Sequence, residues 1–495
     1  MSRRPRPLCR RVTPIWETKI NKTIRFGTDG WRGLLADDFT FENVRLCTQA
    51  IAQYMLADGL AGGGLVIGYD TRFLSAEFAA ACAEVMAGNG IRVFLTREAT
   101  PTPVISYAIA ERRAGGGIIV TASHNPAQWN GLKYKSGDGA SAAVEVISAI
   151  EKQIATVQPG DIKFTSLKTA VRAGQMEWVD LYPAYEAQVG RLLDLNALRQ
   201  SSLSVVVDSM HGAGAGYFKR LLAGGNVRVN EINAEINPAF PGIRQPEPIG
   251  VNLAKLAERV TASGAGVGLA TDGDADRLGI IDEQGNFLNQ LQVYALLALY
   301  LLEVRGERGP IVKTITTTSM LYRLGEQFGI PVFEVPVGFK YVAPVMLREN
   351  AIMGGEESGG YGFRGHVPER DGLLAGLFFL DLMARTGNSP SGLAEYLFSK
   401  VGRHYYDRLD VHFAPSEREA IIERLRQNEP DFIDGLRVIK KDPQDGFRFI
   451  LDDGSWLLIR FSGTEPLLRI YTETDSTARV ARMLAIGAEL AGVRI

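Results

Sequence analysis

Residues 121–126 read Thr-Ala-Ser-His-Asn-Pro, and they place a hydroxyl group just after an apolar run at residues 116–120. The run predicts a strand, so Ser123 should lie past the strand's carboxyl end, where ligands gather in open α/β sheets. Pro126 disfavours a helix through the residue before it, so we expect the serine on a loop. Serine is a weak nucleophile that needs a base, a metal ion or prior phosphorylation. The neighbouring His124 is not assumed to be that base, because adjacent side chains in an extended chain point in opposite directions.

Three aspartates, Asp272, Asp274 and Asp276, stand at alternate positions after a second apolar strand pattern. Oxygen ligands without histidine or cysteine suit Mg²⁺ or Ca²⁺ rather than zinc. A calcium-binding EF-hand is rejected, because its sixth position would be Arg277 instead of glycine and residues 278–281 read as a strand. The sequence therefore predicts a site for a hard divalent cation.

A third group of residues, near the C-terminus, has the ingredients of a phosphate cradle: hydroxyl groups, a glycine turn and guanidinium groups. Its members are Arg460, Ser462, Gly463, Thr464 and Arg469. Glu356 and Ser358, in a loop bounded by glycines, offer an acceptor and a hydroxyl suited to sugar hydroxyl groups. Residues 26–33 form another glycine-rich turn with Arg32 embedded in it, and arginine binds phosphate through two parallel hydrogen bonds.

Three rounds of a strand–helix–strand–helix–strand pattern position these loops. The rounds end at the Ser123 loop, the aspartate loop and the Glu356 loop, and they amount to an internal repeat. After residue 390, alternating strand patterns and two helices indicate a different unit. We therefore predict an α/β protein with three tandem repeated α/β domains with mixed sheets, followed by a C-terminal α+β domain. The predicted boundaries are 1–23 for a basic tail and 24–160, 175–284, 285–400 and 404–495 for the four domains.

Composition excludes several other classes of protein. The net charge of −2 argues against nucleic acid as a partner. Cys9, Cys47 and Cys82 have no CxxC spacing, so they suggest neither a disulfide framework nor a zinc site and fit a cytoplasmic protein. The arginine-rich first dozen residues lack the apolar segment of a secretory signal. The most apolar stretch, 291–304, is too short to span a bilayer comfortably, so it predicts a buried helix and no membrane partner.

Five segments together resemble the signature loops of the α-D-phosphohexomutases, in that family's order from about Ile24 to the C-terminus. They are residues 26–30 (Phe-Gly-Thr-Asp-Gly), 121–126, 272–277 (Asp-Gly-Asp-Ala-Asp-Arg), 355–359 (Gly-Glu-Glu-Ser-Gly) and 460–466 (Arg-Phe-Ser-Gly-Thr-Glu-Pro). The resemblance implies four domains around a central cleft and a phosphoserine enzyme. Such an enzyme interconverts hexose 1-phosphates and hexose 6-phosphates, with hexose 1,6-bisphosphate as intermediate and activator. The implied partners are small-molecule hexose phosphates, and we expect a monomer or homodimer.

The resemblance also implies a role for each matched residue. Ser123 carries the phosphoryl group, and its oxygen joins the three aspartates around one Mg²⁺ per active site. The implied catalytic residues are Ser123, Arg32, His124 and Lys133, with Lys133 a candidate general base. The implied substrate-binding residues are Arg277, Lys340, Glu356 and Ser358, together with Arg460, Ser462, Gly463, Thr464 and Arg469 for the non-reacting phosphate.

The chain departs from many bacterial phosphomannomutase/phosphoglucomutase relatives after the Gly-Glu-x-Ser-Gly segment, where they have histidine and this chain has Gly360. An acid/base role for that histidine is not carried over, and His366 is a candidate to approach the same space. Residues 355–372 look closer to the phosphoglucomutase side of the family, so glucose phosphate is the expected substrate. A phosphomannomutase, a dual-specificity enzyme and a glucosamine phosphate mutase stay open.

A metal-dependent phosphatase that uses Ser123 is the alternative from another class. A phosphatase needs only one phosphate site, however, whereas this chain has a sugar loop and a second phosphate loop. A non-catalytic sugar-phosphate binder conflicts with the intact Ser123, Lys133 and aspartates. A serine hydrolase is disfavoured because Ser123 lacks the Gly-x-Ser-x-Gly elbow.

Overall fold

The computed structural model describes residues 24–27, 29–462 and 467–493, and the predicted basic tail lies outside these ranges. Three consecutive units share one strand order, in which the first strand lies between the third and the second and all three run parallel. The strands are β2 (Leu65–Tyr69), β3 (Val93–Thr96) and β4 (Gly116–Val120); β7 (Ser204–Asp208), β8 (Arg228–Ile232) and β9 (Val267–Thr271); β12 (Ile311–Thr314), β13 (Val332–Val335) and β14 (Met353–Gly355). The predicted repeat of three α/β units with mixed sheets is confirmed.

An antiparallel strand follows the third strand of every unit and pairs with it. These strands are β5 (Trp129–Ser136), β10 (Leu278–Ile281) and β15 (Tyr361–Phe363). The serine, aspartate and Glu356 loops are therefore equivalent hairpin connections of three similar sheets. Residues 130–133, which follow the Ser123 segment in the sequence, belong to β5. Side chains alternate between the two faces of β5. Leu132 and Tyr134 face the apolar core, whereas Lys133 is buried on the opposite face among carboxylates.

The first sheet extends further than the sequence predicted. Strand β1 (Trp31–Leu34) pairs with β5, and β6 (Met176–Val179) pairs in parallel with β3 at the opposite edge. Residues 176–179, which the sequence analysis assigned to the second domain, thus form the edge strand of the first sheet. The second unit begins with α6 (Tyr182–Leu192).

Helices cover the sheets and supply much of the core. They include α1 (Phe41–Ala57), α2 (Ser75–Gly88), α3 (Thr102–Glu111), α4 (Val144–Ile154), α7 (Leu195–Arg199), α9 (Ala254–Ser263), α10 (Gln290–Leu299), α11 (Met320–Phe328), α12 (Phe339–Glu349), α13 (Gly372–Thr386) and α14 (Pro390–Val401). One continuous apolar core joins residues of all three units. Helix α10 and the π-helical turn after it (Tyr300–Val304) are buried almost throughout, which confirms the predicted buried helix. In the described ranges, no helix is long and apolar enough to cross a membrane.

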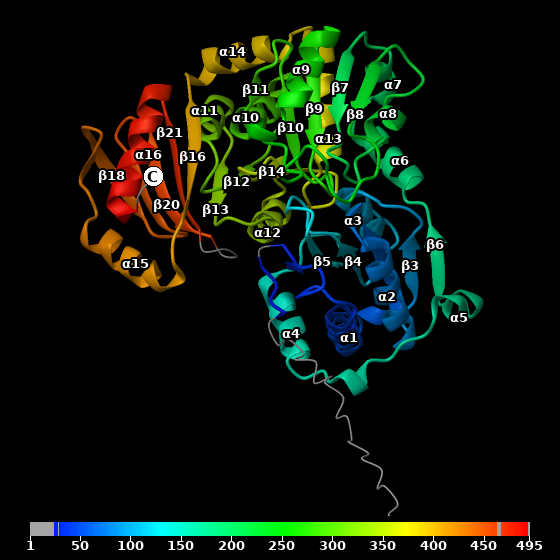
Figure 1. Cartoon of the computed structure of the whole chain (residues 1–495). Helices are drawn as coiled ribbons and strands as arrows, with labels where there is room; N and C mark the ends of the chain where they lie inside the picture. Colours follow the sequence, from blue (N-terminus) through cyan, green and yellow to red (C-terminus); the bar gives the residue numbers. More distant parts are fainter. Residues whose placement is uncertain (1–23, 28, 463–466, 494–495) are drawn as a thin grey trace, which may run out of the picture.

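The fourth unit is an antiparallel six-stranded sheet with its own apolar core, as the predicted α+β domain requires. Its strands, in spatial order, are β16 (Tyr405–His412), β21 (Leu467–Thr474), β20 (Trp456–Phe461), β19 (Phe447–Leu451), β18 (Leu436–Asp442) and β17 (Phe432–Ile433), and its helices include α15 (Arg418–Gln427) and α16 (Thr477–Ala491). Figure 1 shows this unit (orange and red) beside the third unit, on the side away from the first sheet (blue). Trp456, Leu458 and Tyr471 pack with Ile315 of the third unit in a small separate core.

Candidate active site

The Ser123 loop is held in an unusual backbone conformation. Ser123 has a φ of 52°, in the left-handed region that non-glycine residues rarely adopt. The buried Arg72 guanidinium donates to four carbonyl oxygens around it, those of Ser123, Asn125, Pro126 and Trp129, at 2.5–3.0 Å. Arg72 also pairs with Asp70 at 3.1 Å. The sequence analysis overlooked Arg72, although Asp70 and Arg72 directly follow strand β2 at the functional edge of the sheet.

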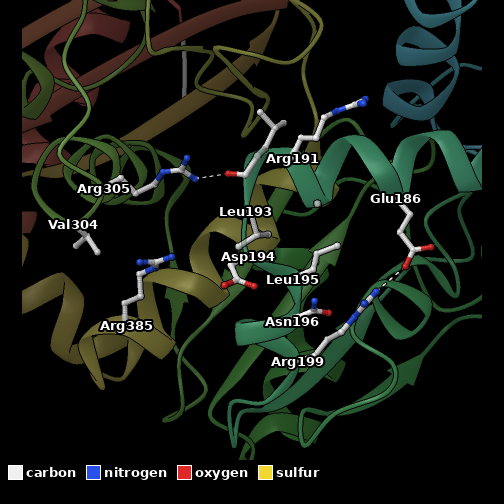
Figure 2. A pocket seen from close by; sticks show the side chains of 12 residues that line it. Glu186, Arg191, Leu193, Asp194, Leu195, Asn196, Arg199, Val304, Arg305 and Arg385 are labelled. Carbon is white, nitrogen blue, oxygen red and sulfur yellow. Dashed lines mark hydrogen bonds and ion pairs between the residues drawn. The ribbon is translucent and has the colours of Figure 1, made fainter.

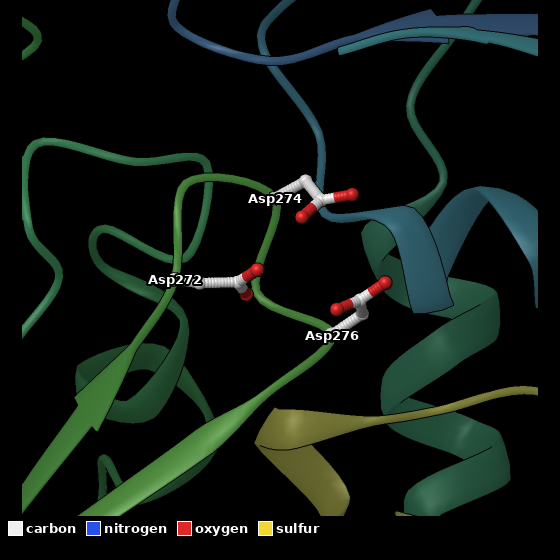
Figure 3. A group of neighbouring side chains, drawn as sticks. All are labelled: Asp272, Asp274 and Asp276. Carbon is white, nitrogen blue, oxygen red and sulfur yellow. The ribbon is translucent and has the colours of Figure 1, made fainter. Parts of the chain in front are cut away.

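The Ser123 hydroxyl donates a 2.8 Å hydrogen bond to Asp272 Oδ2. Figure 3 shows the carboxylates of Asp272, Asp274 and Asp276 on the loop after β9, turned toward a common space. All three are fully buried, and one oxygen from each lies within 4.8 Å of the others. Asp274 Oδ1 and Asp276 Oδ1 have no hydrogen-bond partner among the described residues, which is costly for buried carboxylate oxygens. The structure therefore brings together the residues predicted to hold a metal.

The charges of these groups also fit a divalent cation. Burial, followed by the nearby Asp274 and Asp276 carboxylates, raises the pKa of Asp272 well above its ordinary value. Three close carboxylates repel one another, and a cation among them offsets that repulsion. Thr102 at the start of α3 donates to Asp274 Oδ2 at 2.7 Å, and this hydrogen bond orients the Asp274 carboxylate. An all-oxygen donor set suits Mg²⁺.

Lys133 extends from β5 into the same carboxylate group. Its Nζ lies 2.7 Å from Asp29 Oδ2, 2.8 Å from Asp274 Oδ2 and 3.3 Å from Asp276 Oδ2. Burial alone would lower the pKa of Lys133, but Asp274, Asp29 and Asp276 together raise it above its ordinary value. The surrounding side chains thus hold Lys133 as a cation. A role as general base requires that these carboxylates no longer surround the ammonium group, so that role stays a prediction.

Arg370 is the central residue that the sequence analysis did not identify. Its guanidinium pairs with Asp29 and Asp276, the latter at 2.8 Å, and also contacts Glu356 at 3.3 Å. It therefore joins the first unit, the predicted metal loop and the predicted sugar loop. The available signal was the polar run at residues 366–372, just before the apolar helix α13.

The position of the Arg370 side chain requires glycine at residue 360. A Cβ atom at Gly360 would lie 2.3 Å from Arg370 Cδ, so the aliphatic part of Arg370 fills the space beside this glycine. His366 does not replace the histidine absent at that position. Its ring lies 3.0 Å from Asp371 and stacks on Tyr107, with a fully buried side chain, so the suggestion that it approaches the site is wrong.

The predicted sugar-binding residues lie around Arg370. Glu356 is buried, and burial raises its pKa although the Arg370 and Arg277 guanidinium groups lower it. Ser358 lies in the turn closed by the 3.2 Å hydrogen bond from the Gly359 N–H to the Glu356 carbonyl and is half-buried. Arg277 pairs with Glu247 at 3.1 Å, and its backbone N–H donates to Asp272 Oδ1 at 3.1 Å.

Arg32 and His124 both lie at the serine loop. Arg32 donates to Asn125 Oδ1 at 2.6 Å, and His124 Nδ1 lies 3.4 Å from Ser123 Oγ. The argument that neighbouring side chains diverge does not hold here, because the left-handed conformation of Ser123 turns the chain. Burial, and then the Arg277 and Arg32 guanidinium groups, lowers the pKa of His124 well below its ordinary value. The imidazole is therefore neutral near pH 7.

The fourth unit presents its two predicted phosphate-binding arginines together. Arg460 of β20 and Arg469 of β21 are directly paired across the two strands, so both side chains lie on one face of the sheet. Ser462 follows β20 and is buried, whereas Gly463 and Thr464 lie outside the described residues. Lys340 lies in the first turn of α12, half-buried, with its Nζ 5.4 Å from the Tyr341 ring centre.

A cavity of about 690 Å³ lies elsewhere, between α6, α7, the π-helical turn and α13. Figure 2 shows arginines along its walls, and several already have partners. Arg199 pairs with Glu186 at 2.7 Å, and Arg305 donates to the Leu192 carbonyl at 2.8 Å. Among the described residues, the cavity wall includes none of the predicted site residues, so this cavity is separate from the active-site group.

Comparison with known proteins places all four units in one family. The matches are phosphoglucomutase/phosphomannomutase alpha/beta/alpha domain I at residues 23–160, domain II at 183–285, domain III at 289–401 and the C-terminal domain at 423–489. The chain is 31% identical to a phosphoglucomutase/phosphomannomutase of Thermococcus kodakarensis, covering 94% of this chain and 98% of the relative. It is 33% identical to a probable phosphoglucosamine mutase of Methanothermobacter thermautotrophicus, covering 93% and 96%.

A solved structure agrees with these relatives. The putative phosphomannomutase of Thermus thermophilus superposes with a TM-score of 0.82 at 35% identity, over 95% of this chain and 99% of that chain. The names of these three proteins divide among glucose, mannose and glucosamine phosphates, so they agree on the reaction type and differ on the sugar. With four matched domains and near-complete coverage, the chain belongs to the phosphoglucomutase/phosphomannomutase family and is a phosphohexomutase, an isomerase of the intramolecular phosphotransferase type.

Proposed function

We propose that the protein interconverts glucose 1-phosphate and glucose 6-phosphate through a phosphoserine at Ser123 and a glucose 1,6-bisphosphate intermediate. The observation that carries this proposal is the 2.8 Å contact of Ser123 Oγ with Asp272 Oδ2, beside two unpartnered aspartate oxygens. A serine bound to a carboxylate cluster that suits a divalent cation is an appropriate acceptor for a phosphoryl group. We expect Ser123, Asp272, Asp274 and Asp276 to hold Mg²⁺, which would neutralise phosphoryl charge when bound.

Two transfers make up the proposed reaction. The phosphoryl group leaves Ser123 Oγ for the 6-hydroxyl oxygen of glucose 1-phosphate, and the hydroxyl proton passes to a base. The bisphosphate then reorients, its 1-phosphoryl group returns to Ser123 Oγ, and the sugar O1 takes up a proton. Lys133 and Arg370 are buried cations close to the aspartates, and Arg32 borders the serine loop, so they are suited to stabilise the transferring charge.

Reorientation requires the enzyme to hold the sugar and its other phosphate in both orientations. Glu356 and Ser358 are proposed to bind ring hydroxyls, Arg277 and Lys340 to bind the substrate as further cations, and the Arg460–Arg469 pair to bind the non-reacting phosphate. The support for Arg460 and Arg469 is their pairing on one sheet face, since two guanidinium groups favour a dianion. The preference for glucose rests on the sequence of residues 355–372, including Gly360.

The test compares glucose 1-phosphate, mannose 1-phosphate and glucosamine 1-phosphate side by side, with Mg²⁺ and with or without glucose 1,6-bisphosphate. Phosphorus NMR separates isomerised sugar phosphate from free inorganic phosphate. Fastest isomerisation of glucose phosphate is expected, with bisphosphate increasing the rate. Faster turnover of mannose or glucosamine phosphate would assign the chain to that sugar, and release of inorganic phosphate as the main product would identify a phosphatase.

A further inference from the structure

Asp445 lies where the third and fourth units meet, in the turn between β18 and β19. One oxygen of its carboxylate, Oδ2, accepts a 3.0 Å hydrogen bond from the backbone N–H of Val337 in the third unit. The same oxygen lies 3.0 Å from Nε of Arg460 in the fourth unit. A single carboxylate thus binds a phosphate-binding candidate and the segment that leads into α12, three residues before Lys340.

The turn that carries Asp445 is built to lie directly against Arg460. Strands β19 and β20 pair with Phe447 opposite Ile459. Gly446 has a φ of 122°, and a Cβ atom there would lie 2.6 Å from the Ile459 carbonyl and 3.3 Å from Arg460 Cα. Glycine at this position therefore lets the turn approach the backbone of β20, which places the Asp445 carboxylate beside the Arg460 guanidinium.

The contact restricts how Arg460 can meet a ligand. The Arg460 side chain is only 10% exposed, so it is largely shielded from water, whereas that of Asp445 is 25% exposed. The closest approach of the carboxylate to the guanidinium is at Nε, so we expect the two terminal nitrogens to bind the ligand. Those two nitrogens can form the parallel hydrogen bonds that arginine makes with a phosphate group. An arginine without this partner would have to lose several rotamers when phosphate binds.

We propose that Asp445 is a positioning residue, which orients Arg460 for the non-reacting phosphate of the hexose phosphate and ties it to the Lys340 segment. This inference rests on the proposed function, because it assumes that Arg460 binds that phosphate. Asp445 itself does not contact the substrate. It acts through Arg460, and its second bond to Val337 makes the correct orientation of Arg460 depend on the docking of the fourth unit on the third.

The test is a double-mutant cycle with Asp445→Asn and Arg460→Ala, measured as kcat and KM for glucose 1-phosphate. Asparagine keeps the size of the side chain and an acceptor for the Val337 N–H, but it loses the charge that holds Arg460. Asp445→Asn should raise KM about tenfold and change kcat little. The non-reacting phosphate is bound equally strongly in the ground state and the transition state, so weaker binding of it affects KM alone. In the Arg460→Ala background the same substitution should change KM no further.

Asp434→Asn is the matched control, since Asp434 also pairs with arginines of the fourth unit, Arg479 and Arg482, at 3.0–3.3 Å. Asparagine tolerates the left-handed backbone of Asp434 (φ 49°), so the fold should be kept and KM unchanged. Asp445→Glu restores the charge on a longer side chain and should recover part of the lost affinity. It also tests the role of Asp445 if the Asp445→Asn protein does not fold.

Three outcomes would overturn the inference. An unchanged KM for both Asp445→Asn and Asp445→Glu, with an active wild-type enzyme, would refute the role of Asp445 and leave the proposed function intact. An equal rise in KM with and without Arg460 would show that Asp445 acts on something else. A wild-type enzyme that isomerises no hexose phosphate would refute the proposed function, and the role of Asp445 with it.

Discussion

Ser123 and Asp272 lie 149 residues apart in the chain, yet the Ser123 hydroxyl donates to Asp272 Oδ2 at 2.8 Å. Each belongs to the hairpin loop of a different sheet, and the two loops are equivalent members of a repeat. A Cβ atom at Gly273 would lie 2.4 Å from the Ser123 carbonyl, so the glycine between the first two aspartates permits this approach. The proposed nucleophile and the proposed metal site are thus assembled by the packing of two domains.

Ser123→Ala should lower isomerase activity by at least about a thousandfold, because it removes the hydroxyl proposed to carry the phosphoryl group. Part of the purified wild-type protein should carry phosphate on Ser123. Intact-mass spectrometry with peptide mapping measures this directly. Ser136→Ala, at the end of β5, is the control and should keep both activity and phosphorylation. Phosphate found only on another residue would disprove the assignment.

Asp274→Asn should weaken Mg²⁺ binding by at least about tenfold, since ligand charge sets the affinity of carboxylate sites for hard cations. Titration calorimetry with MgCl₂ gives the affinity independently of activity. Chelation of the wild-type enzyme should abolish turnover, and added Mg²⁺ should restore it. Asp58→Asn, at the exposed C-cap of α1, serves as the control. Full activity of Asp274→Ala in metal-free buffer would contradict the metal site.

Glu356→Ala should lower kcat/KM for the preferred hexose phosphate about ten- to a hundredfold, because it leaves a sugar hydroxyl without a partner and removes one of the carboxylates that pair with the buried Arg370. Phosphorylation of Ser123 and Mg²⁺ affinity should be spared. Glu326→Ala, on the exposed face of α11, should change none of these quantities. If kcat/KM stays the same for every hexose phosphate, the sugar site lies elsewhere.

Arg460→Lys should raise KM for hexose phosphate, because lysine keeps the charge and loses the two-pronged geometry. Small-angle scattering of the wild-type enzyme should show compaction with glucose 1,6-bisphosphate, as expected if the fourth unit closes on the sugar phosphate. Arg482→Lys, an exposed arginine on α16, is the matched control. Normal affinity of Arg460→Lys together with no compaction would mean that the Arg460 segment is only structural.

The contact between the third and fourth units should depend on acid pH through Glu334, which pairs with Lys313 at 2.8 Å and with Arg448. Burial would raise the pKa of Glu334, but Lys313 and Arg448 lower it to about 2 from 4.5. A depressed carboxyl pKa contributes stability that is complete above about pH 4.5 and is lost as the pH falls toward 2.

Glu334→Gln should therefore lower Tm at neutral pH and reduce the dependence of Tm on pH below about 4.5. Thermal denaturation followed by circular dichroism over this range is the measurement. Glu419→Gln, exposed on α15, provides the baseline. An equal pH dependence in Glu334→Gln and wild type would rule out Glu334 as the source of the acid sensitivity.

Local sequence determined the repeat and its loops. Each apolar strand followed by Ser, Asp, Glu or Gly predicted a functional loop at a sheet edge, and the structure places Ser123, Asp272, Asp274 and Asp276 together as expected. These features are readable because strand periodicity, proline and glycine act over only a few residues.

Only the tertiary structure decided how charges are shared between the units. Arg370 reaches Asp29, Asp276 and Glu356, and Asp445 joins Arg460 to Val337; no local pattern predicts such contacts, because their partners come from other domains. The carboxylate partners of Lys133 were not predicted, for the same reason. Lys133 lies between the apolar Leu132 and Tyr134 of β5, and carboxylates of two domains, Asp29 with Asp274 and Asp276, make its burial favourable.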